Sequence, residues 1–272
     1  MGASAPIGVF DSGIGGLSVL KHIHACLPND DLLYFADSGY APYGGKSEEE
    51  IVARSRAIAE FLMQYQPKAL VVACNTATAA AIKALRESYP ALPVVGVEPG
   101  LKPAAALTKS GTVGVLATER TLASAKFQVL RDQIAAATKV LFLPQPCRGL
   151  ADQVEKGELH SAATAMLVRR YIEPLLEQGA DTLVLGCTHY PFVRPLIEET
   201  VSRLTSQPVA IVDTGEPVAR QLLRLLKERG LLRTEGDGSV IGFTTKSETA
   251  LSDAFSRLLD ISAPVTRVAT SA

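Results

Sequence analysis

The sequence predicts an α/β protein with two similar α/β domains, whose mainly parallel sheets face each other across a central cleft. Short apolar runs rich in β-branched residues alternate with helical stretches along the chain of 272 residues, and this alternation is typical of parallel sheets joined by helices. Two short cysteine segments resemble each other, and each follows one of these runs. Pro99 and Gly100 interrupt the alternation and indicate a first domain boundary.

The composition restricts the class of partner. The net charge of −1 gives no electrostatic case for binding nucleic acid or an anionic membrane. No apolar run approaches the ~18 residues of a membrane span, and the N-terminal residues show no basic region, so we expect no signal peptide. The four cysteines include no C-x-x-C pair, which argues against a disulfide scaffold or a zinc ribbon. Free thiols without an export signal predict a cytoplasmic protein.

The first predicted strand, Ile7–Phe10, leads into a polar, glycine-rich turn that begins with Asp11-Ser12. A helix follows from Leu17 until Pro28 stops it. The glycines allow a ligand to approach the main chain, and N–H groups at a helix start favour an anion. A dinucleotide fingerprint is the alternative interpretation, but that motif needs a third glycine where this chain has Ser18.

The second predicted strand, Asp31–Phe35, leads to a loop rich in turn residues, Asp37–Gly45. Because this loop leaves its strand as the first turn does, we expect both at the same edge of the sheet. A plain connecting loop is the alternative. Ser47 and Glu50 then predict a capping box, which starts a helix that runs to about Tyr65.

The two cysteines follow the predicted buried strands Ala69–Val72 and Thr182–Leu185. Cys74 and Cys187 therefore stand at carboxyl ends of strands, where α/β sheets place their chemistry. The alternative is that both are ordinary core cysteines, a common setting for a free thiol. A core position does not account for the polar neighbours, which need partners if buried. These neighbours are Asn75, Thr76, Thr188 and His189.

The rest of the chain continues the alternation. Thr118 comes just after a predicted strand, and a later loop leads to a helical stretch that carries Asp152 and Glu155. A long amphipathic helix precedes the second cysteine segment. The other predicted strands are 93–97, 112–116, 139–143, 208–212, 239–243 and 265–268.

Two thiols in matched settings suggest a reaction with two matched roles. A thiolate removes a carbon-bound proton effectively when the pKa of the thiol lies close to the working pH, and free cysteine titrates near ~8.5. One thiolate can deprotonate a carbon while a second thiol delivers a proton to the opposite face, which inverts that carbon. Aligned donors must stabilise the carbanion. Candidate donors are Ser12, Asn75, Thr76 and Thr188, and Asp11 and His189 could assist the two thiols.

Four segments in order resemble the motifs of the glutamate racemase family, within the cofactor-independent aspartate/glutamate racemases. They begin at Asp11, Asp37, Ala73 and Gly186 and read DSGIGG, DSGYAPYG, ACNTAT and GCTHYP. The resemblance extends from about Ile7 to Glu216. It implies an isomerase that interconverts L- and D-glutamate by 1,1-proton transfer, and so supplies D-glutamate for peptidoglycan, the cell wall and cell shape. It implies no cofactor and no metal.

The resemblance also implies roles for individual residues. The thiol that matches Cys74 would act on D-glutamate and the thiol that matches Cys187 on L-glutamate, assisted by Asp11 and His189. An auxiliary catalytic glutamate aligns with Glu155, and Asp152 is the alternative. The implied substrate-binding residues are Asp11, Ser12, Pro42, Tyr43, Gly44, Cys74, Asn75, Thr76, Thr118, Cys187, Thr188 and His189.

The family fold implies where the domains divide. Its first domain is completed by the C-terminal stretch, so we expect residues 1–100 with 209–272 in one domain and residues 101–208 in the other. The oligomeric state varies in the family, and a homodimer is one assembly that the resemblance allows. We expect glutamate as the small-molecule partner, with no nucleic acid and no membrane.

Three other functions stay open. The same scaffold could racemise aspartate. The distance from the reacting carbon to the protein donors that bind the substrate's side chain would decide this, and the sequence does not give that distance. A cysteine hydrolase could use one thiol with His189 and leave the other thiol structural. A binding module could hold an acidic amino acid without exchanging its α-proton. A pyridoxal enzyme is disfavoured because no lysine lies within a motif.

Overall fold

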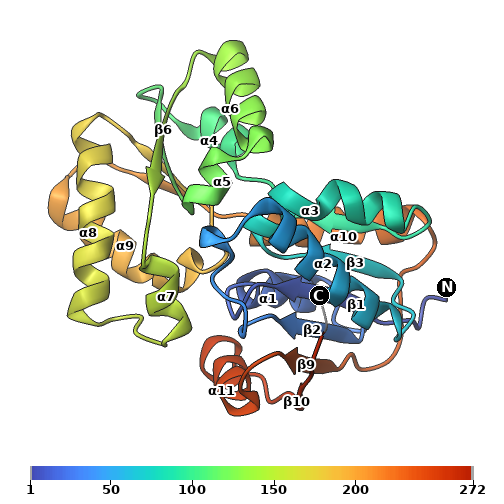
Figure 1. The fold of residues 1–272 in the computed structure, drawn as a ribbon. Helices are drawn as coiled ribbons and strands as arrows, with labels where there is room; N and C mark the ends of the chain where they lie inside the picture. Colours follow the sequence, from blue (N-terminus) through green and yellow to red (C-terminus); the bar gives the residue numbers. More distant parts are fainter. Residues whose placement is uncertain (1, 271–272) are drawn as a thin grey trace. The chain divides into compact units, whose positions relative to one another are not determined.

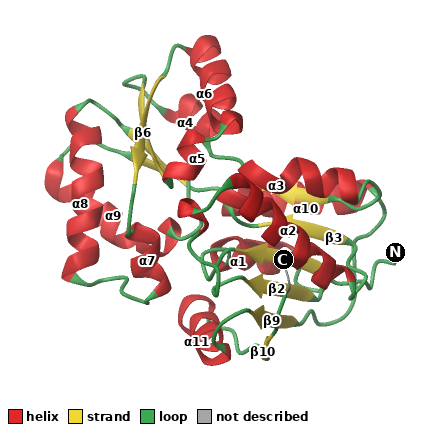
Figure 2. Ribbon diagram, in the orientation of Figure 1, coloured by secondary structure: helices red, strands yellow, loops and turns green. Residues whose placement is uncertain are grey.

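The computed structural model describes residues 2–270, which form two α/β units (Figures 1 and 2). Unit 1 extends from the N-terminal end to Val97 and again from Gly215 onward, and unit 2 is Glu98–Thr214. Each unit contains one parallel sheet, so the predicted α/β class with two parallel sheets is confirmed. The predicted cleft between the sheets stays a prediction.

The sheet of unit 1 has six parallel strands in the order β10-β9-β2-β1-β3-β4. Every residue of β1 is buried, because this strand lies inside the sheet and is covered on both faces. This burial explains why the strands are continuous apolar runs rather than alternating ones. The strands are β1 (Ile7–Asp11), β2 (Leu32–Ala36), β3 (Ala69–Val72), β4 (Val94–Gly96), β9 (Val240–Thr244) and β10 (Val265–Arg267).

Helices cover both faces of this sheet. On one face, apolar side chains of α2 (Glu48–Met63) and α3 (Asn75–Ser88) form a common core with Phe10, Phe35 and Val72. On the other face, Tyr34 meets Phe255 of α11 edge to face, with ring centroids 5.8 Å apart. The helices packed there are α1 (Leu17–Cys26), α10 (Gly215–Glu228) and α11 (Glu248–Leu259).

The sheet of unit 2 has four parallel strands in the order β6-β5-β7-β8. Apolar residues of α4 (Leu101–Leu107) and α6 (Ala125–Thr138) pack on one face. On the other face α8 (Ala162–Glu177) lies so close that a Cβ added at Gly114 would stand 2.7 Å from Leu175 Cδ1. The strands are β5 (Thr112–Ala117), β6 (Leu141–Pro146), β7 (Thr182–Leu185) and β8 (Ala210–Val212). The remaining elements are η1 (Tyr43–Gly45), α5 (Glu119–Ala123), α7 (Leu150–Glu155), η2 (Tyr190–Val193) and α9 (Arg194–Leu204).

Both predicted boundaries differ from the division in the structure, which also puts residues 98–100 in unit 2. Residues 209–214 were expected in the first domain, but β8 pairs in parallel with β7, with Thr182 opposite Ala210. The chain therefore leaves unit 2 only at Gly215. Helices α4 and α6 were not predicted. In α6 Phe127 is the one buried residue, so its sequence shows no broad apolar face.

Candidate functional site

Three predicted polar segments of unit 1 meet at one edge of its sheet. Strand β1 lies between β2 and β3 and runs parallel to both. Asp11, Asp37 and Cys74 come at or just after the carboxyl ends of these three strands. Ligands of α/β sheets bind at this edge, so these residues form the candidate site of unit 1.

Cys74 is the N-cap residue of α3 and is 5% exposed. Its Sγ accepts a hydrogen bond from the Ala77 main-chain N–H, with a distance of 3.4 Å. The same Sγ lies 3.8 Å from Ser12 Oγ. A main-chain donor and the N-terminus of a helix both favour negative charge on the sulfur.

Asp11 is fully buried at the end of β1. Its Oδ2 accepts a hydrogen bond of 2.9 Å from the Gly13 N–H, and Tyr34 Oη donates to the Gly13 carbonyl over 2.7 Å. A Cβ at Gly16 would stand 2.6 Å from Asp11 Cβ. The glycine at position 16 is therefore required for the turn to close around the Asp11 carboxylate.

Asn75 carries an unusual buried amide. The residue is 4% exposed, and neither its Oδ1 nor its Nδ2 has a hydrogen-bond partner among the described residues. Buried amides nearly always have partners, and this one directly follows Cys74 in the chain. A polar ligand at this edge would supply what the protein does not, and Thr76 is buried beside it in sequence.

The loop after β2 has a buried anchor. Pro42 is exposed and Gly44 is half-buried, but Tyr43 between them is 1% exposed. Tyr43 Oη donates a hydrogen bond of 2.5 Å to Asp37 Oδ2, so the proton of its hydroxyl group already has an acceptor within the protein. The capping box predicted at the start of α2 is confirmed, with Ser47 as its N-cap residue.

A second candidate site lies in unit 2, where β7 ends. Cys187 Sγ stands 3.5 Å from His189 Nδ1, and His189 Nε2 stands 2.7 Å from Glu155 Oε1. Burial disfavours a charged imidazole here. Hydrogen bonds and negative charge from Cys187 and Glu155 outweigh burial and raise the pKa of His189 well above its usual range. The protein thus holds a thiol, an imidazole and a carboxylate in one chain of contacts.

The structure distinguishes the two candidate carboxylates. Glu155, at the end of α7, contacts His189, whereas Asp152 stands one turn earlier on the same helix. Thr188 is buried between Cys187 and His189 in sequence. Thr118 is the N-cap residue of α5. Its Oγ1 accepts a hydrogen bond from the Thr121 N–H and so stabilises the start of that helix.

Cys147 was not among the predicted site residues, but the structure puts it near Cys187. It is 4% exposed, and burial together with the negative charge of Cys187 strongly raises the pKa of its thiol. Its Sγ lies 3.3 Å from the Gln145 carbonyl, and Tyr190 Oη donates to the Cys147 carbonyl over 3.4 Å. The signal that could have found it is its place after a strand end, at the close of β6.

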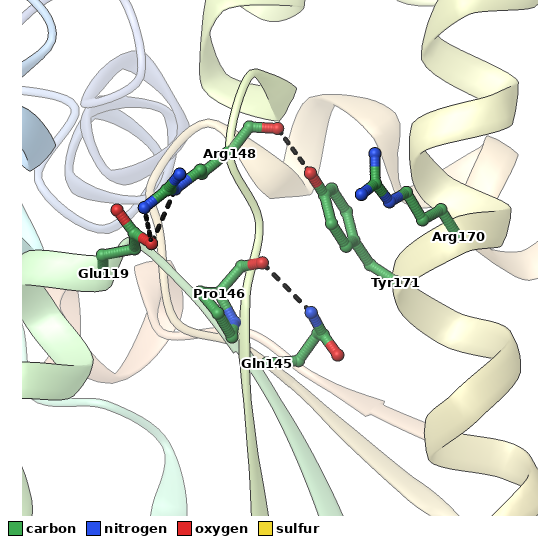
Figure 3. Close-up of a pocket in the computed structure, with 6 residues that line it drawn as sticks. All are labelled: Glu119, Gln145, Pro146, Arg148, Arg170 and Tyr171. Carbon is green, nitrogen blue, oxygen red and sulfur yellow. Dashed lines mark hydrogen bonds and ion pairs between the residues drawn. The ribbon is translucent and has the colours of Figure 1, made fainter.

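Unit 2 also has a cavity of about 310 Å³ that contains none of the predicted site residues (Figure 3). Arg148 pairs there with Glu119 at 2.6 Å, and Tyr171 Oη donates to the Arg148 carbonyl over 2.6 Å. The Arg148 side chain is 79% exposed, so this cavity is a solvent-facing polar depression beside the Cys147 loop. Its lining residues are Glu119, Gln145, Pro146, Arg148, Arg170 and Tyr171.

Residues 2–270 contain neither a metal-binding cluster nor a helix that could span a membrane. In this part of the chain no three His, Cys, Asp or Glu side chains are grouped so that they could hold a metal ion. No helix within it has the length and the apolar character that a membrane span needs.

Sequence comparison places the chain among known proteins. A model of the Asp/Glu/Hydantoin racemase family matches residues 7–222. The chain is 56% identical over 233 residues to the glutamate racemase of Ectopseudomonas mendocina, and the aligned residues make up 86% of each protein. It is 52% identical over 258 residues to the glutamate racemase of Pseudomonas paraeruginosa, and the aligned residues make up 95% of this chain and 94% of that protein.

Solved structures agree with this placement. Glutamate racemase isoform RacE1 from Bacillus anthracis has a TM-score of 0.87 and 34% identity over 97% of each chain. The Francisella tularensis glutamate racemase in complex with D-glutamate has a TM-score of 0.85 and 29% identity over 98% of each chain. The Escherichia coli enzyme, in complex with L-glutamate and the activator UDP-MurNAc-ala, has a TM-score of 0.82 and 30% identity over 98% of this chain and 99% of that chain.

Proposed function

The chain belongs to the Asp/Glu/Hydantoin racemase family and is an isomerase, and we propose that it interconverts L-glutamate and D-glutamate without a cofactor. Relatives that are 56% and 52% identical to it over the aligned residues are named glutamate racemases. Two similar solved structures are glutamate racemases in complex with D-glutamate and with L-glutamate. The substrate of this chain is inferred from these likenesses.

The observation that carries the mechanism is the setting of the two thiols. Cys74 and Cys187 are both buried at carboxyl ends of parallel strands. In the proposed reaction one sulfur, as thiolate, takes the α-proton of glutamate, and the other, as thiol, gives a proton to the opposite face of the carbanion. Product release leaves the protonation states exchanged, so the reverse reaction uses the same groups. By family likeness Cys74 acts on D-glutamate and Cys187 on L-glutamate.

Each thiol has its own means of carrying negative charge. Around Cys74 these are the Ala77 N–H and the N-terminus of α3. Beside Cys187 it is His189, whose raised pKa favours the imidazolium form. Glu155 contacts the far nitrogen of that imidazole and holds it in the orientation in which Nδ1 meets the thiol. Asp11 is the proposed assistant to Cys74.

Substrate binding is assigned to polar groups at the carboxyl ends of strands in the two sheets. The unpartnered Asn75 amide supports this assignment, because a bound amino acid offers both a donor and an acceptor. Ser12, Thr76 and Thr188 add hydroxyl groups, and the loop of Pro42 to Gly44 completes the set. We further propose that the product supplies D-glutamate for peptidoglycan in the cytoplasm, and that the active form is a homodimer.

A second candidate function has one observation in its favour. The contacts from Cys187 to His189 to Glu155 have the order of a thiol, an imidazole and an orienting carboxylate, the arrangement used by cysteine hydrolases. Such an enzyme would form an acyl intermediate on Cys187 and would not need Cys74. Racemisation of aspartate on the same scaffold is the nearer alternative.

The deciding experiment is incubation with L-glutamate in D2O without added cofactor, with α-proton exchange and optical rotation followed together. Deuterium at the α-carbon with decaying rotation is the expected result. Exchange with aspartate but not with glutamate would keep the mechanism and change the substrate. If neither acid exchanged its α-proton, the racemase proposal would be wrong and the hydrolase would be the better candidate.

A further inference from the structure

Arg54 is a buried arginine at the same edge of unit 1 as Cys74. It lies on α2 and is 3% exposed, a rare environment for arginine. Its guanidinium forms a two-point pair with Asp37, from Nε to Oδ2 over 3.0 Å and from Nη2 to Oδ1 over 2.8 Å. This fork geometry is specific to arginine.

Asp37 connects Arg54 to the loop that follows β2. Besides the two arginine nitrogens, its carboxylate accepts hydrogen bonds from Tyr43 Oη over 2.5 Å and from Thr245 Oγ1 over 3.0 Å. Each carboxylate oxygen therefore has two donors. The loop with Pro42, Tyr43 and Gly44 is fixed at Tyr43 through a carboxylate that Arg54 holds in place.

Arg54 also reaches the C-terminal segment. Its Nη1 donates to the Thr270 carbonyl over 3.0 Å and its Nη2 to Thr270 Oγ1 over 2.6 Å. The ring of Tyr40 lies 3.6 Å below the guanidinium carbon, a distance at which cation–π attraction operates. One side chain thus joins α2, the loop after β2 and the C-terminal segment.

Stability alone does not explain this arrangement. Buried ion pairs are often no more stabilising than apolar side chains of the same volume, and their best-supported benefit is one defined geometry. Unit 1 has a second buried pair, Lys68 with Asp30, in which both residues precede strands β3 and β2. That pair lies at the amino ends of the strands, away from Cys74, and provides a matched control.

We propose that Arg54 is a positioning residue for substrate binding: it holds Asp37 and, through the Tyr43 hydroxyl, sets the loop assigned to glutamate. This inference rests on the proposed function. Since Arg54 acts on the loop and not on either thiol, its loss is expected to weaken glutamate binding far more than it slows proton transfer.

The test is a double-mutant cycle of Arg54→Lys and Tyr43→Phe. Lysine keeps the charge but cannot form the fork, and phenylalanine removes only the hydroxyl. Each variant is expected to raise KM for both isomers about tenfold, equivalent to about 1.4 kcal/mol, with kcat changed less than about threefold. Because both changes break one chain of contacts, the double variant is expected to resemble the single variants rather than reach about a hundredfold.

The control is Lys68→Met, which breaks the other buried pair and is expected to lower the melting temperature while KM stays unchanged. The inference is overturned if Tyr43→Phe leaves KM unchanged, if the two KM effects multiply, or if Lys68→Met raises KM as much as Arg54→Lys. Tyr43→Phe deletes a single atom, so this readout remains if Arg54→Lys does not fold.

Amide hydrogen exchange separates this inference from the proposed function. Residues 38–46 are expected to exchange faster in Arg54→Lys than in the wild type or in Lys68→Met, whatever the substrate is. If the wild type does not racemise glutamate, the proposed function fails and the exchange result alone decides the role of Arg54. Equal exchange in all three proteins would overturn that role.

Discussion

Cys74 and Cys187 have the same burial but different neighbours. The first thiol is stabilised by a main-chain N–H at a helix start, and the second contacts an imidazole backed by a carboxylate. A two-thiol reaction needs both, since each sulfur serves one face of the substrate carbon. A hydrolase needs only the thiol beside His189.

Replacing either thiol separates these possibilities. Cys74→Ser and Cys187→Ser are each expected to lower racemisation by about 10² to 10⁴ in both directions, the range that a positioned acid or base contributes to the rate. The measurement is optical rotation with each isomer of glutamate. Cys26→Ser is the matched control, because Cys26 is a half-buried free thiol on α1, and its turnover is expected to stay at the wild-type level. Near wild-type turnover in either test variant would contradict the two-thiol mechanism.

Glu155→Gln is expected to change the pH profile. Removing the carboxylate removes one of the causes that raise the pKa of His189, so that pKa falls. The imidazolium is then lost at a lower pH, and the alkaline limb of kcat moves toward lower pH. Loss of a charge-assisted hydrogen bond costs about 1.5–3 kcal/mol, which is roughly tenfold or more in kcat.

The same linkage applies to folding. A raised pKa of His189 stabilises the native state fully at pH below the usual histidine range, and this contribution disappears as the pH rises through the folded-state pKa. Glu155→Gln is therefore expected to lower the melting temperature mainly at acidic and neutral pH. Asp152→Asn, one turn earlier on α7, is the control; an equal shift of either profile would mean that the contact with His189 is not the cause.

At the scale of elements, each candidate site is a strand that ends in a tight turn before a helix. The turn after β1 shows why glycine is needed there. A Cβ at Gly16 would stand 2.6 Å from Asp11 Cβ and 2.9 Å from Tyr34 Oη, whereas a Cβ at Gly45 has open space around it among the described residues. The two glycines form a natural pair for comparison.

Gly16→Ala is expected to lower the free energy of unfolding by about 1–3 kcal/mol, the usual effect of overpacking, and to reduce turnover because Asp11 must shift. Urea denaturation and kcat would be measured together. Gly45→Ala is expected to change the free energy of unfolding by less than about 0.5 kcal/mol. Equal stability of the two variants would show that the turn adapts to a methyl group.

The elements that could be predicted are those with local signals. The strands before Cys74 and Cys187, the capping box at Ser47 and the polar strand ends are short-range patterns, so the sequence could predict them. The pairing of β8 with β7 could not be predicted because it depends on which sheet an exposed edge meets. Contacts such as Arg54 with Asp37 were missed because tertiary packing brings these residues together.

At the scale of the whole molecule, the two units differ in how the chain builds them. Unit 2 is one continuous segment, whereas unit 1 needs two. Strand β2 pairs with β9 from the C-terminal part of the chain, and α1 packs on α10 and α11. Without the C-terminal part, β2 would be an open edge and α1 would expose its apolar face.

Fragments test this difference. Residues 98–214 alone are expected to unfold cooperatively, because they contain a complete sheet with helices on both faces. Residues 1–97 alone are expected to show no cooperative transition. Circular dichroism during thermal and urea unfolding would measure both. A cooperative transition of the 1–97 fragment would show that β9, α10 and α11 are dispensable for the first sheet.

The unlike neighbours of the two thiols have a thermodynamic consequence. Mirror-image amino acids have equal free energies in water, so no enzyme can move their equilibrium ratio away from unity. The specificity constants in the two directions must then be equal, however different the surroundings of the sulfurs are. In the proposed two-thiol mechanism, the helix start at Cys74 and the imidazole at Cys187 can therefore change kcat and KM between the two isomers only by the same factor.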